Sequence, residues 1–203
     1  TYNNYCYKKV VKLGYMILST RFANATTYAI SLHEGQNRKN TDIPYISHLL
    51  AVTAIVLEEG GDEDLAIAAI LHDAVEDQGG MFRLIEIREK FGDRVASIVE
   101  GCSDSITLPK PPWRTRKANY LEHLQAANHD VLLVSLADKV HNSSTICKDL
   151  KTEGVAVWDR FNGGKEGTLW YYKQLAEIFS KSSSLSTILI NQFIENVKFI
   201  EDF

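Results

Sequence analysis

The feature that most constrains this chain is an apolar run that ends in two ionisable residues. Residues 65–71 read Leu-Ala-Ile-Ala-Ala-Ile-Leu, and His72 and Asp73 follow directly. Asp62 can cap a helix and the glycine pair at 79–80 can stop it, so we expect one helix from about residue 62 to about residue 77. A carboxylate beside so apolar a run is costly to bury unless it is paired or binds a metal. The run therefore predicts a buried helix with a functional site at its edge.

The His-Asp dipeptide at 72–73 is weak evidence on its own, because a second one occurs at 129–130. The second dipeptide lies in a polar stretch before an apolar run, where Asp130 is explained as a helix N-cap. Glu76 and Asp77 each lie four residues after a member of the first dipeptide, which places all four side chains on one side of the expected helix. Such closely spaced carboxylates repel each other without a cation. This segment alone leaves open a metal site and a solvated acidic helix end.

Asp138 and His48 add two further candidate ligands. Asp138 follows the apolar run 131–137, and a buried Asp is rare without a partner. The alternative for Asp138 is an ion pair with Lys139 or another basic group. His48 lies one turn into a helix expected to begin at Pro44; a single His on an apolar face is more often a core residue, so its assignment depends on the others.

Together these residues offer two imidazoles and two carboxylates. This donor set leaves open positions for water on a divalent ion such as Mn, Fe or Zn. Such an ion lowers the pKa of bound water and polarises a phosphoryl oxygen. The constellation therefore favours hydrolytic chemistry.

The remaining pattern predicts an all-α, compact single-domain helical bundle. Apolar residues recur every three or four positions, and no segment alternates like a half-buried strand. Further helices are expected at 115–127, 131–150, 167–180 and 185–203. We expect an N-terminal helical extension at 1–18, a hydrolase domain at 19–180 and a C-terminal helical appendage at 181–203.

Composition narrows the class of protein. The chain has 203 residues, of which 45% are hydrophobic and 24% charged, as in soluble globular domains. A net charge of -4 argues against coating a nucleic acid polymer, and no apolar run is long enough to span a membrane. The start of the chain shows no secretory pattern, and its three cysteines form no CxxC pair, so we expect a cytoplasmic protein.

The order His, His-Asp, Asp resembles that of the HD superfamily. The flanking sequence resembles the hydrolase domain of RelA/SpoT enzymes and, more closely, the stand-alone small alarmone hydrolases, which include the metazoan SpoT homologues. The resemblance extends from about residue 19 to about residue 180. The stretches that carry it are 33–39 (HEGQNRK), 44–48 (PYISH), 71–77 (LHDAVED), 91–92 (FG), 110–114 (KPPWR), 136–139 (LADK) and 158–162 (WDRFN).

The resemblance implies a manganese-dependent enzyme that removes the 3′-diphosphate from alarmones such as ppGpp, pppGpp or their adenosine analogues. It implies that the ion is held by His48, His72, Asp73 and Asp138. It implies that Glu76 and Asp77 position or activate the attacking water. The residues that it places around the nucleotide are Arg38, Lys39, Tyr45, Asn142 and Tyr171. The implied partner is a small nucleotide, and a homodimer stays open.

Two departures from the family keep other functions open. Ala74 and Gln78 stand where many relatives have Thr, and the segment 102–118 differs from the RelA/SpoT pattern. The alternatives are an HD nucleotidase or NADPH phosphatase that releases orthophosphate, and a catalytically silent nucleotide-binding sensor. Of the histidines outside the constellation, His33 is expected to be structural, and His123 and His141 are expected to face solvent.

Overall fold

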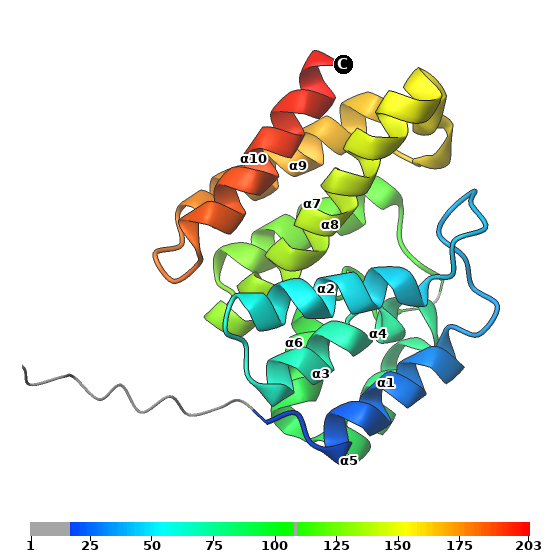
Figure 1. The fold of residues 1–203 in the computed structure, drawn as a ribbon, viewed down its shortest axis with the longest axis vertical. Helices are drawn as coiled ribbons and strands as arrows, with labels where there is room; N and C mark the ends of the chain where they lie inside the picture. Colours follow the sequence, from blue (N-terminus) through cyan, green and yellow to red (C-terminus); the bar gives the residue numbers. More distant parts are fainter. Residues whose placement is uncertain (1–16, 108) are drawn as a thin grey trace, which may run out of the picture.

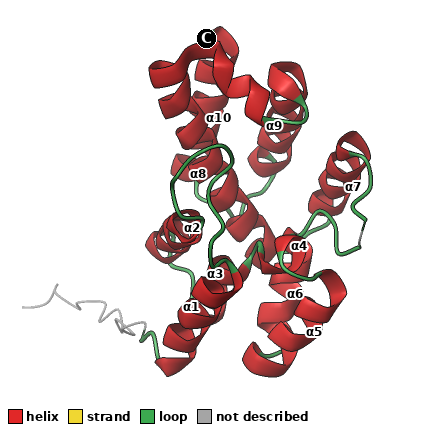
Figure 2. Cartoon of the chain, turned by 90° about the vertical axis from the view of Figure 1, so that its right-hand side faces the viewer, coloured by secondary structure: helices red, strands yellow, loops and turns green. Residues whose placement is uncertain are grey.

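The computed structural model describes residues 17–107 and 109–203, and this part of the chain folds entirely into helices and loops (Figures 1 and 2). The predicted all-α class is confirmed. The elements in chain order are α1 (Thr20–Leu32), α2 (Ile46–Glu58), α3 (Glu63–Leu71), α4 (Ala74–Asp77), α5 (Gly80–Phe91), α6 (Asp93–Cys102), α7 (Trp113–Gln125), α8 (His129–Glu153), the 3-10 helix η1 (Gly154–Arg160), α9 (Gly164–Ser180) and α10 (Thr187–Asp202).

Helix α3 lies in the middle of the lower half of the molecule in Figure 1 and is buried on all sides. Every residue from Leu65 to Leu71 is buried, and the helix packs against α1, α2, α6 and α8. The predicted cap is confirmed, because the side chain of Asp62 accepts a hydrogen bond from the backbone N–H of Leu65 at 3.0 Å. Because α3 is apolar and packed among other helices, it fixes the position of His72 and Asp73, which follow its last residue.

The expected single helix over 62–77 is wrong, because α3 ends at Leu71 and α4 begins at Ala74. His72 and Asp73 form the turn between the two helices. The imidazole Nδ1 of His72 lies 2.8 Å from the carbonyl oxygen of Ala69, and the backbone N–H of His72 bonds to the same carbonyl. A continuous helix would give that carbonyl to the N–H of Asp73, so the side chain competes with the helical hydrogen-bond ladder.

Helix α8 is the long central helix and packs against α2, α3, α6 and α10. Its N-cap is Asn128, whose side-chain oxygen accepts a hydrogen bond from the N–H of Val131 at 3.1 Å. Asp130 is therefore not the N-cap, contrary to expectation. It lies in the first turn of α8, and its carboxylate is 2.9 Å from Arg94 Nη2.

The end of the chain packs on the rest of the bundle. The helix expected at 185–203 is α10, and its apolar face lies on α8 and α9, beside them in Figure 1. The ring of Phe193 lies 5.5 Å from that of Tyr172 and 5.9 Å from that of Phe179, so α10 belongs to the common apolar core. The extension predicted for 1–18 lies, apart from residues 17 and 18, outside the described residues. None of the described helices combines the length and the apolar character needed to cross a membrane.

Candidate active site

Three buried side chains from distant segments meet at the end of α3. His48 comes from α2, His72 from the turn after α3, and Asp138 from α8; they are 1%, 2% and 7% exposed. The Nε2 atoms of His48 and His72 lie 3.2 Å and 3.7 Å from Asp138 Oδ1, and one ligand atom from each residue lies within 4.8 Å of the others. The structure thus brings together residues that the sequence separates by up to ninety positions.

Asp73, the fourth predicted ligand, adjoins this cluster. Its Oδ2 lies 3.1 Å from His72 Nε2 and 3.5 Å from His48 Nε2. The hydroxyl of Tyr45 donates a hydrogen bond of 2.6 Å to the same oxygen. Asp73 thus presents a carboxylate oxygen to both imidazoles, beside the group of His48, His72 and Asp138 whose ligand atoms all lie within 4.8 Å of one another.

The orientation of the two imidazoles fits a metal ion. His72 Nδ1 bonds to the carbonyl oxygen of Ala69, so in the neutral ring this nitrogen carries the proton and Nε2 carries the lone pair. His72 Nε2 is buried, and the atoms that it faces, Asp73 Oδ2 and Asp138 Oδ1, are acceptors like itself, so in the neutral ring this nitrogen lacks a hydrogen-bond donor, which a buried acceptor rarely does. Two nitrogen and two carboxylate donors suit a borderline-to-hard divalent ion.

The charges at this point also favour a cation. Burial would raise the pKa of the Asp138 carboxyl, but Lys139 and the two imidazoles hold it well below its usual range. Burial likewise opposes ionisation of Asp73, whereas His72 and His48 hold its pKa well below the usual range. The two carboxylates in turn raise the pKa of His72 well above its usual range against the effect of burial. The cluster therefore attracts positive charge, as a proton or as an ion.

The surroundings of Asp138 are compatible with both interpretations that the sequence left open, a metal ligand and a member of an ion pair. Its Oδ1 faces the imidazoles and accepts a hydrogen bond from the side-chain amide of Asn142. Its Oδ2 forms an ion pair with Lys139. One carboxylate thus serves a candidate metal site and a buried ion pair at once.

Glu76 and Asp77, the predicted catalytic pair, lie on the short helix α4. Lys110 Nζ lies 3.2 Å from Glu76 Oε1 and 3.3 Å from Asp77 Oδ1. Glu76 also lies 3.4 Å from Arg116 Nη1 and lines the pocket described below, whereas Asp77 does not line it. Burial, with the neighbouring Asp104, raises the pKa of Glu76. A carboxyl whose pKa is raised suits general acid–base work.

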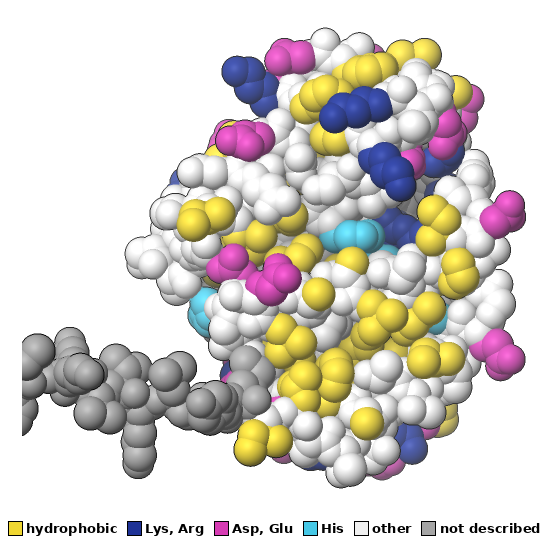
Figure 3. All heavy atoms as spheres, viewed as in Figure 1, with side chains coloured by type: hydrophobic (Ala, Val, Ile, Leu, Met, Phe, Trp, Pro, Cys, Tyr) yellow, Lys and Arg dark blue, Asp and Glu magenta, His cyan; other side chains and the backbone are white. Residues whose placement is uncertain are grey.

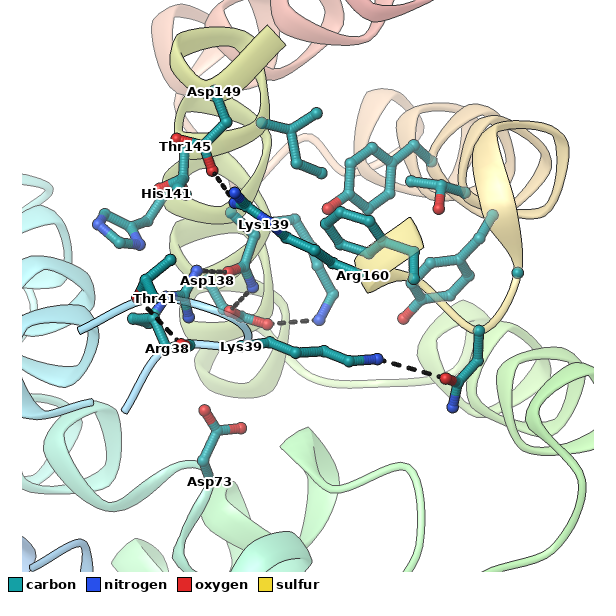
Figure 4. A pocket seen from close by; sticks show the side chains of 18 of the residues that line it. Arg38, Lys39, Thr41, Asp73, Asp138, Lys139, His141, Thr145, Asp149 and Arg160 are labelled. Atoms are coloured by element: carbon teal, nitrogen blue, oxygen red, sulfur yellow. Dashed lines mark hydrogen bonds and ion pairs between the residues drawn. The ribbon is translucent and has the colours of Figure 1, made fainter. Parts of the chain in front are cut away.

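A pocket of about 490 Å³ opens beside the cluster (Figure 4). Asp73 and Asp138 reach it from the metal-site side, and much of the remaining wall is basic. On the face in Figure 3, Lys and Arg side chains gather in the upper half, and some lie beside a histidine in a hollow near the centre. The basic residues that line the pocket are Arg38, Lys39, Lys117, Lys139, Lys148 and Arg160. A pocket with metal-ligating groups on one side and cations on the other suits a phosphorylated small molecule.

All five residues predicted to surround a nucleotide line this pocket: Arg38, Lys39, Tyr45, Asn142 and Tyr171. Arg38 Nη2 donates a 2.7 Å hydrogen bond to Asn142 Oδ1, which links the loop before α2 to α8. Lys39 Nζ donates a hydrogen bond of 3.3 Å to Asn162 Oδ1. Figure 4 shows the Lys39 side chain extended across the pocket, with a dashed line at its end. The hydroxyl of Tyr171 is buried without a hydrogen-bond partner.

His141 was expected to face solvent, and this expectation is wrong. It is half-buried and lines the pocket, and its Nδ1 lies 2.8 Å from His48 Nδ1. Burial, with His48 and Arg38, lowers the pKa of His141 to about 4. The signal was its position three residues after Asp138, which places both side chains on one face of a helix. Lys110, which the structure places on the predicted catalytic pair, lies in a loop without such periodicity.

A family model described as an HD domain matches residues 25–169, which is more than half of the chain. This chain belongs to the HD domain family. It is 42% identical over 130 residues to the guanosine-3′,5′-bis(diphosphate) 3′-pyrophosphohydrolase MESH1 of Xenopus tropicalis, a match that covers 63% of this chain and 68% of that protein. The MESH1 protein of Danio rerio is 38% identical, over 57% of this chain and 63% of its own length.

Longer relatives match over a smaller share of their length. The bifunctional (p)ppGpp synthase/hydrolase SpoT of Escherichia coli is 36% identical over 62% of this chain but only 18% of its own sequence. The predicted relation to RelA/SpoT-type hydrolases is thereby confirmed.

Two solved structures superimpose on this chain over most of its length. A metazoan ortholog of SpoT that hydrolyzes ppGpp superimposes with a TM-score of 0.72 at 24% identity, over 89% of this chain and 95% of that one. A protein of Listeria monocytogenes superimposes with a TM-score of 0.68 at 30% identity, over 77% of this chain and 99% of that one.

Proposed function

We propose that this protein is a metal-dependent phosphohydrolase that removes the 3′-diphosphate from alarmone nucleotides such as ppGpp, pppGpp or their adenosine analogues. The observation that carries the proposal is the buried, unpartnered Nε2 of His72 beside His48 and two carboxylates, at the wall of a basic pocket of about 490 Å³. The names of the relatives support the same reaction.

The proposed ligands of the ion are His48, His72, Asp73 and Asp138, and the proposed ion is Mn²⁺, with Fe or Zn as alternatives. When bound, a divalent ion supplies Lewis-acid polarisation of a phosphoryl oxygen and lowers the pKa of water. The imidazole of His72 is held for this role by a backbone carbonyl, which does not depend on the identity of any neighbouring side chain.

The proposed catalytic residues are Glu76 and Asp77. Glu76 lines the pocket on the same side as Asp73, and its raised pKa suits a group that takes up a proton from water as the phosphorus is attacked. Lys110 holds both carboxylates of the pair, and Arg116 holds Glu76. These two cations limit the repulsion between Glu76 and an anionic substrate.

The proposed substrate-binding residues are Arg38, Lys39, Tyr45, Asn142 and Tyr171. The guanidinium of Arg38 and the ammonium of Lys39 can donate hydrogen bonds to phosphate oxygens and balance their negative charge. The unpartnered hydroxyl of Tyr171 can hydrogen-bond to the substrate. The proposed partner is a small nucleotide, in preference to a nucleic acid polymer or a membrane. The proposed site of action is the cytoplasm. Both a monomer and a homodimer are compatible with this proposal.

The test is a substrate panel on protein that has been stripped of metal and reloaded with manganese. The panel contains ppGpp, pppGpp, ppApp, pppApp, NADPH and dNTPs, and the released product is identified. We expect pyrophosphate from an alarmone. Orthophosphate as the sole product would assign the nucleotidase or NADPH phosphatase function instead, and no turnover of any compound would leave the sensor function.

Two matched variants assign the reaction to the site. Asp73→Asn should lose most of its bound manganese and most of its turnover. Asp130→Asn changes the Asp of the second His-Asp dipeptide, which is paired with Arg94 outside the pocket, and should keep both. Full turnover of the Asp73→Asn variant after reloading would contradict the proposal.

A further inference from the structure

His141 makes a single defined contact with one of the proposed metal ligands. His48 turns its Nε2 toward Asp138 and Asp73 and its Nδ1 toward His141 Nδ1, which lies 2.8 Å away. The two rings lie with their centroids 4.8 Å apart and their planes at 40°. The ring of Tyr45 packs edge-on against His48 at 5.6 Å, so the orientation of this imidazole is restricted from a second side.

The position of the proton between the two rings follows from the chemistry of imidazole. Two ring nitrogens at hydrogen-bond distance need one proton between them, carried by one of the two. An ion bound by Nε2 of His48 takes the lone pair of that nitrogen, so the remaining ring proton lies on Nδ1. His48 is then the donor, and Nδ1 of His141 is the acceptor.

We propose that His141 is a positioning residue, which accepts the hydrogen bond of His48 Nδ1–H and thereby directs His48 Nε2 toward the metal ion. The inference rests on the proposed metal-dependent function. Metal-bound imidazoles generally donate their second N–H to a carboxylate, a carbonyl or a water, which fixes the ring and raises its basicity. Here the acceptor is another imidazole, carried on the same helix as the ligand Asp138.

The two proposed histidine ligands are thus oriented in different ways. His72 is held by the carbonyl oxygen of Ala69, which no substitution removes. His48 is held by a side chain, which can be replaced without changing any proposed ligand. This difference makes the contribution of His141 measurable on its own.

The experiment compares His141→Leu with His141→Asn, which have side chains of nearly equal size. The Oδ1 atom of Asn can occupy the place of Nδ1 and accept the hydrogen bond, whereas Leu offers no acceptor. Loss of such an outer partner lowers metal affinity by about 10–100-fold. We expect that loss for His141→Leu and an affinity close to that of the unchanged chain for His141→Asn. His123→Leu, an exposed position on α7 outside the pocket, is the matched control.

Affinity is measured without substrate, by titrating each protein with Mn²⁺ against a chelator and following the free ion by electron paramagnetic resonance. Thermal melts in the presence of a chelator show that each variant is folded. If His141→Leu does not fold, His141→Ala, which adds no apolar volume, takes its place. The proposal also predicts that turnover of the Leu variant recovers at high Mn²⁺ with an unchanged KM.

Three results would overturn the inference. Equal affinities of His141→Leu and His123→Leu would show that His48 does not depend on His141. Equal losses in the Leu and Asn variants would show that the acceptor is not what matters. Normal affinity with a raised KM would make His141 a substrate contact instead. If the unchanged chain itself retains no divalent ion, the proposed function falls together with the inference, which separates that failure from the others.

Discussion

The ion pair between Asp138 and Lys139 offers a quantitative test of the site. Their side chains are only 9% and 12% exposed, so removing one charge leaves the other buried without its partner. Breaking such a pair costs about 3–5 kcal/mol. For Asp138→Asn we expect the lower end, about 3 kcal/mol of unfolding free energy, because Lys139 borders the pocket and can be hydrated there. Asp138→Asn also removes the repulsion between Asp138 and Asp73, which lowers the cost of the substitution further.

The double variant Asp138→Asn/Lys139→Met separates stability from metal binding. Replacing both members of a buried pair by neutral groups is often close to neutral, so we expect the double variant to lie within about 1 kcal/mol of the unchanged chain. Lys139→Met alone leaves Asp138 with only the imidazoles as counter-charges, and we expect it to be destabilised as well. Neither variant that lacks the Asp138 carboxylate should hold the ion tightly, whatever its stability.

The assay is urea unfolding of metal-stripped protein followed by circular dichroism, with the four proteins treated as a double-mutant cycle. Bound manganese is then measured on reloaded samples by mass spectrometry. The reasoning is refuted if Asp138→Asn unfolds at the same urea concentration as the unchanged chain. It is also refuted if the loss of stability in the double variant equals the sum of the losses in the two single variants, because the two costs would then be independent.

Two further predictions concern the elements around the pocket. Asp104 is 3% exposed, and although burial raises its pKa, Lys117 and Arg116 hold it below its usual range. The contribution of Asp104 to stability is therefore fully present above the pKa that its carboxyl has in the unfolded chain, and it is lost as the pH falls from there through the lower pKa of the folded state. Asp104→Asn should make the stability depend less steeply on pH in this range. An unchanged slope would contradict the assignment. A Cβ added at Gly163 would lie 2.7 Å from Trp113 Cη2, so Gly163→Ala should cost about 1–3 kcal/mol by overpacking. Gly167→Ala, inside α9 and 3.2 Å from the same ring, should lower the melting temperature less, and the reverse order would be inconsistent with this packing.

Three of the four proposed ligands, His72, Asp73 and Asp138, could be predicted because they adjoin apolar runs, whereas His48 was predicted mainly from its sequence context and the resemblance to the HD superfamily. Burial can be inferred from a run such as 65–71 or 131–137, and an ionisable residue beside it then requires a partner. The same reasoning gave the helical class and most helix positions. It did not give the break at His72, because a hydrogen bond from a side chain to a carbonyl three residues back leaves the apolar pattern unchanged.

Contacts between helices could not be predicted in the same way. His141 is one of several polar residues in the second half of α8, and only the packing of α8 against α2 shows that it faces His48. Lys110 lies in a proline-rich loop whose path depends on the position of α7. The ring of Trp113 fixes that position against Gly163 and Gly167 at the start of α9, an approach that requires the absence of side chains there.

Helix α10, at the end of the chain, contacts α8 next to the site. One turn of this helix carries Asp138, which faces the imidazoles, His141, which contacts His48, and Asn142, which binds Arg38. Directly after Asn142, the hydroxyls of Ser143 and Ser144 accept hydrogen bonds of 3.0 Å and 2.9 Å from the side-chain amide of Asn196 on α10. Helix α10 lies beyond the segment that matches the HD domain, yet its Asn196 is bonded to α8 directly after the residues that carry the proposed metal and substrate contacts. Because those contacts share one helical turn, a rotation of α8 would displace all of them together.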